Sequence, residues 1–229
     1  MIPLAILLLL FAALDWLAVA RCWKKVEYFA KPATMLILLV LPFLAGGFGS
    51  PPLLWFSLGI FFSLAGDVFL MVSYSRFSNR WFFAGLVAFL CTHLAYIVGL
   101  NTPIPNVSPI WSFGLAIILA LGAARLLRRV IAGVRQKGLP RLVLPVGAYG
   151  TVITLMLLSA LLPFYDPAWK VSAAALVAGG AILFYFSDVI LAWNRFVNPI
   201  RNGRLANMIL YHLGQFALVA GVLLQFGKW

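Results

Sequence analysis

Charged residues are scarce in this sequence of 229 residues. Aspartate, glutamate, lysine and arginine together account for 10% of the chain, whereas 64% of its residues are hydrophobic. In a typical soluble domain about a quarter of the residues are charged and about half are apolar. The composition therefore excludes a chain built mainly of soluble domains. Together with a mean hydropathy of +1.06, it predicts an integral membrane protein with no extramembrane domain.

Cysteine and histidine are also few, with two residues of each type. Cys22 lies among basic residues and Cys91 lies inside an apolar run, so neither a disulfide nor a thiolate metal site is expected. His93 and His212 are too few for a three-histidine zinc site, which leaves a mixed histidine and aspartate site as the alternative. Because the sequence shows no evident cluster of ligands, we predict no metal and no organic cofactor.

Long apolar runs dominate the chain and predict its fold. A run of about 20 apolar residues is long enough to cross a membrane as a helix. The runs occupy residues 2–20, 32–47, 52–72, 81–100, 110–127, 142–164, 171–193 and 205–226. No positive charge precedes the first run and Asp15 interrupts it, so we read a retained helix rather than a cleaved signal peptide. The sequence thus predicts an all-α polytopic membrane protein, a bundle of eight transmembrane helices, in which residues 1–229 form a single transmembrane domain.

The basic residues indicate how the helices are oriented. The net charge of +12 could suggest a nucleic-acid partner, but the basic residues lie in short segments between apolar runs, as membrane topology requires. The ends of the first, third, fifth and seventh helices and the segments after them hold 15 of the 17 basic residues. Because cytoplasmic loops are enriched in lysine and arginine, we expect both termini on the non-cytoplasmic side, and no nucleic-acid partner. The longest basic loop, about residues 128–141, is expected to contact anionic lipids.

Two aspartates, Asp67 and Asp188, interrupt the apolar runs in similar surroundings, and each is followed further on by Arg-Phe. A carboxylate at the centre of a membrane helix costs roughly 2.5–3.5 kcal/mol, so its presence suggests a function. His93 follows Asp67 by 26 residues, and His212 follows Asp188 by 24 residues. This internal echo predicts two parallel four-helix halves.

Other polar residues are predicted to gather near these aspartates. At about 1.5 Å of rise per residue, Asp67 and Asp188 lie about 10 Å inside the cytoplasmic boundary. Asn207, Tyr211 and Gln215 recur every four residues and form one stripe on the last helix. The further candidates are Lys31, His93, Tyr96, Tyr149 and Asn194. We predict that these side chains line one polar, hydrated pocket in the cytoplasmic half of the membrane.

Simpler roles remain open for the same residues. The tyrosines, the histidines and Gln215 could serve only as hydrogen-bonding contacts between helices. The aspartates could form structural ion pairs with basic residues further along the chain, and Asp15 could also reach the membrane boundary. These pairs would be Asp67 with Arg76, Asp188 with Arg195, and Asp15 with Arg21.

Several of these residues form an ordered set that resembles the YhhN-like lysoplasmalogenase family of eight-helix membrane proteins. The matching elements are Lys31-Pro32, Gly66-Asp67 with Leu70, His93 with Tyr96, Ser187-Asp188, and Tyr211 with Gln215. The resemblance covers nearly the whole chain. It implies that a lysophospholipid is the substrate, that its vinyl ether bond is hydrolysed, and that Asp67 and Asp188 are the catalytic pair. It also implies a multi-pass protein of the bacterial inner membrane, surrounded by membrane lipids.

The chemistry of a vinyl ether agrees with a pair of aspartates. Acid protonates the β-carbon, water adds to the resulting oxocarbenium ion, and the hemiacetal collapses to a fatty aldehyde and a glycerophospho-ethanolamine or -choline. Glycosidases direct two carboxyls at the same kind of cation. In a low-dielectric pocket, burial and mutual repulsion favour keeping one carboxyl protonated and the other ionised. The sequence leaves open which aspartate is the acid.

Three other functions fit parts of the sequence. A proton-coupled transporter would explain the repeat and the buried acids, but transport needs access from both faces, and the polar residues gather on one side. An intramembrane aspartyl protease also uses two membrane aspartates, yet the Pro-Ala-Leu element of such proteases is absent. A non-catalytic lipid-binding protein is the third alternative.

The predicted orientation can be tested by labelling cysteines in intact cells. In a background without Cys22 and Cys91, an impermeant thiol reagent should label a Lys170→Cys variant and leave an Arg135→Cys variant unlabelled. The reason is that position 135 lies in the basic segment expected in the cytoplasm, whereas position 170 lies on the opposite side. Both variants should react once the cells are broken. Labelling at position 135 from outside the cell would show that the orientation is opposite to the predicted one.

Overall fold

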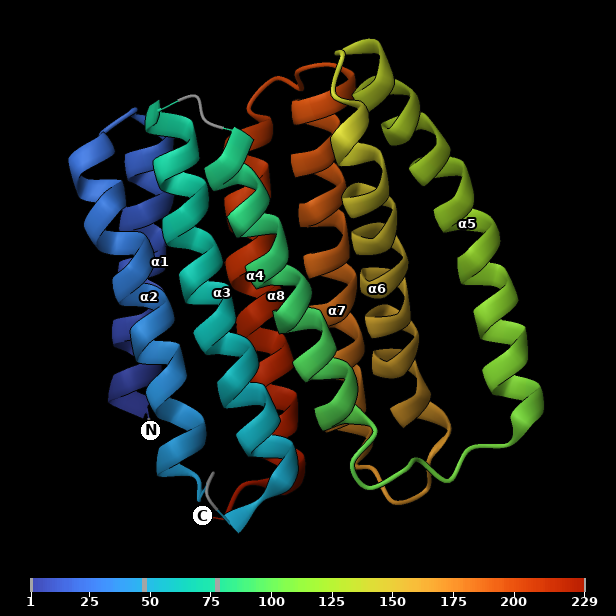
Figure 1. The fold of residues 1–229 in the computed structure, drawn as a ribbon. Helices are drawn as coiled ribbons and strands as arrows, with labels where there is room; N and C mark the ends of the chain where they lie inside the picture. Colours follow the sequence, from blue (N-terminus) through green and yellow to red (C-terminus); the bar gives the residue numbers. More distant parts are fainter. Residues whose placement is uncertain (1, 47–48, 77–78, 229) are drawn as a thin grey trace. The chain divides into compact units, whose positions relative to one another are not determined.

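The computed structural model describes residues 2–46, 49–76 and 79–228, and long α-helices make up most of them (Figure 1). The helices are α1 (Ile2–Ala20), α2 (Lys24–Leu44), α3 (Pro51–Arg76), α4 (Asn79–Leu100), α5 (Pro109–Gln136), α6 (Val143–Leu161), α7 (Val171–Ala192) and α8 (Gly203–Phe226). These eight helices of the described chain are all long and apolar enough to cross a membrane, and no strand occurs in the same residues. The predicted all-α membrane fold is thereby confirmed.

The helices form two compact units. Unit 1 comprises Met1–Thr102 with Val222–Trp229, and so contains α1 to α4 and the last residues of α8. Unit 2 comprises Pro103–Gly221, and so contains α5 to α7 and most of α8. The boundary falls between α4 and α5, where the sequence repeat also divides the chain. The assignment of residues 1–229 to a single transmembrane domain stays a prediction.

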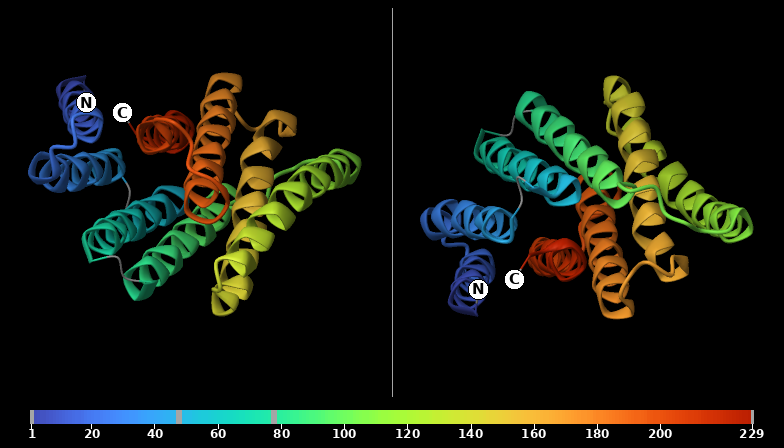
Figure 2. Two further views of the ribbon diagram at one scale, coloured as in Figure 1. Left: turned by 90° about the horizontal axis from the view of Figure 1, so that it is seen from above. Right: turned by 90° about the horizontal axis from the view of Figure 1, so that it is seen from below.

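In unit 1 the helices pack in chain order, with α1 on α2, α2 on α3 and α3 on α4 (Figures 1 and 2). The end of the chain returns to this unit, since the Lys228 N–H donates to the carbonyl oxygen of Ala45 at 3.1 Å, just after α2. Figure 1 shows the start of α1 at the same end of unit 1. This placement agrees with an even number of crossings. The side of the membrane on which the termini lie stays a prediction.

The α3–α4 interface is close because glycines of one helix face aromatic rings of the other. A Cβ at Gly59 would lie 2.3 Å from the ring of Tyr96, and a Cβ at Gly66 would lie 2.7 Å from the ring of Phe89. The Thr92 hydroxyl adds a polar contact, 3.1 Å from the Gly59 carbonyl oxygen. These contacts fix the rotation of α3. Because successive helical residues are about 100° apart, a Gly66 that faces α4 turns the next residue, Asp67, away from α4.

The helix α2 begins earlier than the hydropathy of the sequence predicts. The apolar run starts at Pro32, but α2 starts at Lys24 and contains Pro32 in its interior. A proline inside a helix removes one backbone hydrogen bond and normally marks an end, which is why the run suggested a start there. The prediction from the apolar run that this helix starts at about residue 32 is therefore wrong. Lys31 lies two turns inside α2 and is buried.

In unit 2 the long helix α5 is the most exposed. It contacts α6 near its Gln136 end and separates from α6 toward Pro109 (Figures 1 and 2). The described residues of α5 that are buried, Val130, Gly133 and Val134, all lie in its last two turns. The rest of α5 presents large apolar side chains such as Phe113 and Leu121 at its surface. In a membrane these side chains contact hydrocarbon rather than water.

The long basic loop predicted for residues 128–141 is mostly helical. Helix α5 continues through the arginines to Gln136, because arginine and lysine are good helix formers. Gly138 ends it with φ +68°, a left-handed conformation that favours glycine. Backbone hydrogen bonds from Gly138 N–H to Arg135 O and from Leu139 N–H to Val134 O complete this cap. The basic side chains therefore stand on a helix end and a short turn, with a 3₁₀ turn at Pro140–Leu142 after it.

The close packing at Gly59 leads to a testable difference between two glycines. Gly59→Ala should lower the melting temperature in detergent, since overpacking typically costs about 1–3 kcal/mol. Gly114→Ala is the matched control, because a Cβ at Gly114 would meet nothing within 4 Å. Thermal unfolding followed by intrinsic fluorescence measures both. Equal melting temperatures for the two variants would contradict the α3–α4 contact.

Candidate functional site

In unit 1, Asp67 forms a buried ion pair with Lys31. The Lys31 ammonium lies 2.8 Å from Oδ1 of Asp67, and the two side chains are only 4% and 1% exposed. The pair joins α2 to α3, with Asp67 turned away from α4 by the packing of Gly66. Arg76, the partner considered from the sequence, has a side chain outside the described part of the structure. The partner that the structure gives to Asp67 thus comes from another helix.

Two further acids surround the same lysine. Asp15 of α1 is 0% exposed and Glu27 of α2 is 2% exposed, and both interact electrostatically with Lys31. Full burial contradicts the alternative that Asp15 reaches the membrane boundary. Glu27 did not emerge from the sequence, because the hydropathy of α2 pointed to a start after it. The signal that could have revealed it is its spacing, four residues before Lys31 on one helix face.

On α4, the predicted site residues His93 and Tyr96 are both fully buried. The Tyr96 ring stacks on Phe56 with centroids 4.5 Å apart and an interplanar angle of 14°, and it also covers Gly59. Gly59 precedes Asp67 by eight residues, which corresponds to about 12 Å along α3. The described contacts of Tyr96 are therefore those of helix packing. Its predicted role in substrate binding, like that of His93, stays a prediction.

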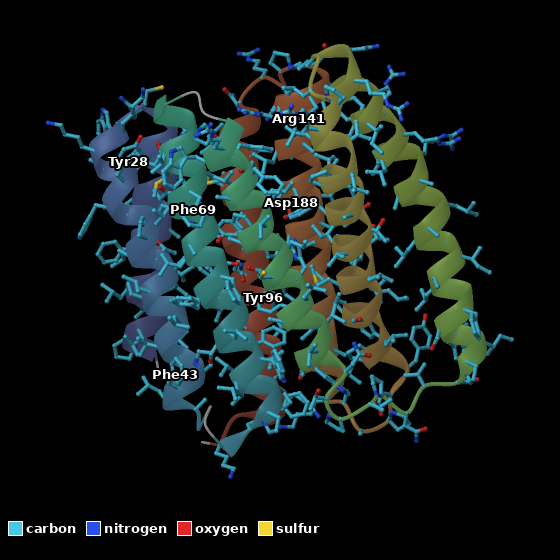
Figure 3. All side chains as sticks on the ribbon, viewed as in Figure 1. Tyr28, Phe43, Phe69, Tyr96, Arg141 and Asp188 are labelled. Atoms are coloured by element: carbon cyan, nitrogen blue, oxygen red, sulfur yellow. The ribbon has the colours of Figure 1, made fainter. Side chains whose placement is uncertain are left out.

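In unit 2, Asp188 is paired with a tyrosine. The hydroxyl of Tyr149 on α6 donates to Oδ2 of Asp188 on α7. Both side chains are partly exposed, unlike those of the ion pair in unit 1. Figure 3 shows Asp188 further into the unit than Arg141, which lies in the 3₁₀ turn before α6. The structure thus brings together two of the predicted site residues, and it places a neutral donor against this aspartate.

The polar stripe on α8 is buried and faces α7. The side-chain amide of Asn207 donates to the Ser187 carbonyl oxygen at 2.8 Å and to the Ser187 hydroxyl at 2.9 Å, directly before Asp188. Tyr211 packs edge-on against Phe184, with ring centroids 5.4 Å apart. Gln215 is fully buried. Asn207 and Tyr211 therefore fix the helical segment that carries Asp188. The roles of Tyr211 and Gln215 toward a substrate stay predictions.

Helix α7 ends in a π-helical turn at Trp193–Val197, a geometry that is frequent at functional sites. Asn194, in this turn, accepts the Ile200 N–H at 2.7 Å and so fixes the α7–α8 connection. The Lys137 ammonium donates to the Arg195 carbonyl oxygen at 2.8 Å, which fastens the α5–α6 turn to the same connection. The predicted site residue Asn194 thus has a structural contact, while a contact with substrate stays a prediction.

Metal coordination was the remaining alternative for the buried acids and histidines. Within residues 2–46, 49–76 and 79–228, no group of three or more His, Cys, Asp and Glu side chains is arranged to hold a metal ion.

The Tyr149–Asp188 hydrogen bond can be tested by its energetic coupling. Tyr149→Phe should lower the melting temperature, since a hydrogen bond within a protein contributes about 1 kcal/mol and up to about 3 kcal/mol where one partner is charged. Asp188→Asn should lower the melting temperature less in the Tyr149→Phe protein than in the wild type, because the two residues share one interaction. Tyr165→Phe is the control, as its ring stacks on Trp111 at a helix end. If the two substitutions lowered the melting temperature by strictly additive amounts, the result would contradict a hydrogen bond between Tyr149 and Asp188.

Several curated proteins are similar in sequence to this chain. The chain is 31% identical over 148 residues to lysoplasmalogenase TMEM86B of Rattus norvegicus, a match that covers 62% of this chain and 52% of the relative. It is 30% identical over 151 residues to lysoplasmalogenase TMEM86B of Homo sapiens, covering 62% and 54%. The chain thus spans about half the length of the curated relatives it matches. No solved structure matches it. The YhhN family matches residues 26–222, a range that includes Lys31, Asp67 and Asp188, and the chain belongs to the YhhN family.

Proposed function

We propose that this protein is a membrane-embedded hydrolase that cleaves the vinyl ether bond of lysoplasmalogens. The products would be a fatty aldehyde and a glycerophospho-ethanolamine or -choline. The observation that carries the proposal is the membership of the YhhN family, whose match includes Asp67 and Asp188, together with relatives that are named lysoplasmalogenases. Eight apolar helices suit a substrate that resides in the membrane.

The reaction assigns two tasks to the protein. A proton must be delivered to the β-carbon of the vinyl ether, which leaves an oxocarbenium ion at the carbon bound to oxygen. Water then adds to that carbon, and the water loses a proton to give a hemiacetal. The hemiacetal breaks its bond to the glycerol oxygen, which takes up a proton, and the aldehyde is released. One group must therefore donate a proton, and a second must stabilise the cation and receive a proton from water.

We assign the ionised role to Asp67. Its carboxylate lies 2.8 Å from the Lys31 ammonium in a buried setting, and an opposite charge at this distance favours the charged form of a carboxyl. A fixed carboxylate in a low-dielectric site stabilises a developing positive charge more strongly than it would in water. Asp67 is thus suited to stabilise the oxocarbenium ion and to activate water.

We assign the proton donor to Asp188. Its partner is the Tyr149 hydroxyl, which brings no positive charge to the carboxyl. The partial exposure of Asp188 leaves it accessible to a substrate and to reprotonation by water. In this proposal the two aspartates act in one catalytic cycle, and their partners determine which of them is the acid.

Substrate binding involves the other residues predicted from the sequence. We propose that Tyr149, Tyr211 and Gln215 contact the lysolipid near the vinyl ether, while His93, Tyr96, Asn194 and Lys31 act mainly by fixing the helices around them. The basic ends of α5 and α8 carry Arg135, Lys137, Arg201 and Arg204, which suit a lipid phosphate at the membrane boundary. The substrate would then enter from the leaflet on the basic side.

A proton-coupled transporter remains the second candidate, and the division into two units of four helices favours it. Transport and hydrolysis differ in their products. Purified protein in liposomes should release aldehyde from a lysoplasmenyl lipid without a change of the internal pH if it is a hydrolase. Substrate-dependent proton uptake into the liposomes, without aldehyde, would support the transporter.

Substitution of either aspartate should remove most of the activity. Asp67→Asn and Asp188→Asn should each lower the rate of aldehyde release by about 10²–10⁴-fold, because each removes an acid–base group. The assay uses lysoplasmenyl-ethanolamine, with the saturated acyl lysolipid as the control substrate that has no vinyl ether. Wild-type turnover should slow in heavy water, since protonation of carbon is the slow step.

The matched control for these variants is Asp166→Asn. Asp166 lies outside the membrane helices, where it accepts the N–H groups of Asn106 and Ala168, so its loss should leave the aldehyde rate of the folded protein unchanged. A near-normal rate in Asp67→Asn or Asp188→Asn would remove that residue from the mechanism. Aldehyde release that stops on addition of a chelator would show that a metal takes part.

A further inference from the structure

Three arginines, Arg125, Arg128 and Arg129, stand on the outward side of α5. They recur at positions i, i+3 and i+4, so they share one face of the helix. All three are exposed. The buried residues Val130 and Val134 lie on the opposite face, because successive helical residues are about 100° apart. The arginines therefore point away from the rest of unit 2.

The contacts of α5 with α6 show how far these arginines lie from the end of unit 2. A Cβ at Gly147 of α6 would lie 4.0 Å from the Ile131 side chain, and a Cβ at Gly150 would lie 2.9 Å from that of Leu127. The end of α5 and the start of α6 are therefore level (Figure 1). With 19 residues, α6 is about 28 Å long, close to the thickness of the hydrocarbon layer. The start of α6 thus marks the membrane boundary.

Relative to that boundary, the three arginines lie within the membrane. Gln136, the last residue of α5, follows Arg129 by seven residues and Arg125 by eleven, which corresponds to about 10–16 Å along the helix. Helical side chains lean toward the N-terminus of their helix, which for α5 is the far end. Arg128 follows this rule, since its Nε donates to the Ala124 carbonyl oxygen at 3.2 Å, one turn further from the boundary. Arg128 therefore leans away from the nearer water.

The sequence around α5 offers these arginines no carboxylate. Residues 103–165 contain no aspartate and no glutamate. The two acids of unit 2 are engaged elsewhere, because Asp166 accepts backbone N–H groups in the turn after α6, and Asp188 accepts the Tyr149 hydroxyl. A positive charge on the lipid-facing side of a membrane helix is costly without a counter-charge. The surroundings of α5 must therefore supply the anion.

A lipid phosphate is the anion that a membrane provides at this depth. Guanidinium groups bind phosphate oxygens through paired hydrogen bonds, and the shared helix face brings three such groups within reach of one headgroup. A choline or ethanolamine headgroup carries a cation that three arginines repel. The headgroup of phosphatidylglycerol carries no cation. Charge complementarity therefore favours an anionic phospholipid over a zwitterionic one.

We propose that the arginine face of α5, formed by Arg125, Arg128 and Arg129, is a binding site for the headgroup phosphate of an anionic phospholipid. The lipid contact expected from the sequence for the loop at residues 128–141 is thereby extended to the side of a membrane helix. The site is separate from the basic helix ends to which we assign the substrate phosphate. It does not rest on the proposed hydrolase function.

The affinity for lipid tests the proposal directly. The purified full-length protein is titrated with phosphatidylglycerol, or with phosphatidylcholine of the same chains, and bound lipid is counted by native mass spectrometry. A triple variant with glutamine at positions 125, 128 and 129 should bind phosphatidylglycerol about 10²-fold more weakly, and phosphatidylcholine with unchanged affinity. Each single substitution should weaken binding about fivefold, which keeps the test available if the triple variant folds poorly.

The matched control removes the same charge from another exposed segment. A triple variant with glutamine in place of Arg21, Lys24 and Lys25, at the α1–α2 turn, should keep most of the affinity for phosphatidylglycerol. Equal losses in the two triple variants would show a general attraction between charges and would overturn the site. An unchanged affinity in all variants of the arginine face would overturn it as well.

Thermal unfolding separates a lipid site from a site for any phosphate. In a neutral detergent, phosphatidylglycerol should raise the melting temperature of the wild type and leave that of the arginine-face triple variant nearly unchanged, because only the folded wild type binds the lipid tightly. Inorganic phosphate at the same concentration should have no such effect. A rise with inorganic phosphate as large as that with phosphatidylglycerol would contradict a lipid site.

Discussion

The Lys31–Asp67 ion pair is the interaction on which unit 1 depends. A carboxylate in hydrocarbon is stable only with a partner, and an ammonium in the same place has the same requirement. The pair at 2.8 Å meets both requirements at once and joins α2 to α3. Removing one partner leaves the other as an uncompensated buried charge, so the two residues constrain each other. The acids Asp15 and Glu27 extend this constraint to α1 and to the first turns of α2.

Close helix packing fixes the direction in which each of the two aspartates points. The rings of Tyr96 and Phe89 cover Gly59 and Gly66, which fixes the rotation of α3 against α4 and so directs Asp67. In unit 2, the side-chain amide of Asn207 donates two hydrogen bonds to Ser187, the residue directly before Asp188. Each aspartate is therefore oriented by a small or polar neighbour in the sequence. Dipeptides such as Gly66-Asp67 and Ser187-Asp188 combine an acid with the residue that positions its helix.

The sequence predicted the fold well, because a membrane imposes a length and a hydropathy on every crossing. The sequence also drew attention to Asp67 and Asp188, which are conspicuous as acids in apolar runs and stay predicted site residues, and to the polar stripe on α8, which is buried. It failed where polar residues begin or end a helix. The first turns of α2 and the last turns of α5 are rich in lysine and arginine, so hydropathy assigned them to loops. Glu27 was overlooked for the same reason, because it lies in the first turns of α2. Partners from other helices, such as Lys31 for Asp67, depend on tertiary packing that spacing along one helix does not contain.

The cost of burying an acid and its use as a catalyst have the same physical origin. Acid cleavage of a vinyl ether at neutral pH needs a carboxyl that keeps its proton, and water makes such a carboxyl rare because it solvates the ionised form. A membrane helix withdraws that solvation. In the proposed mechanism the protein also needs a second carboxyl that stays ionised beside a cation, as Asp67 lies beside Lys31. The ammonium partner of Asp67 in unit 1 and the phenol partner of Asp188 in unit 2 are the difference from which we propose opposite roles for two chemically identical side chains.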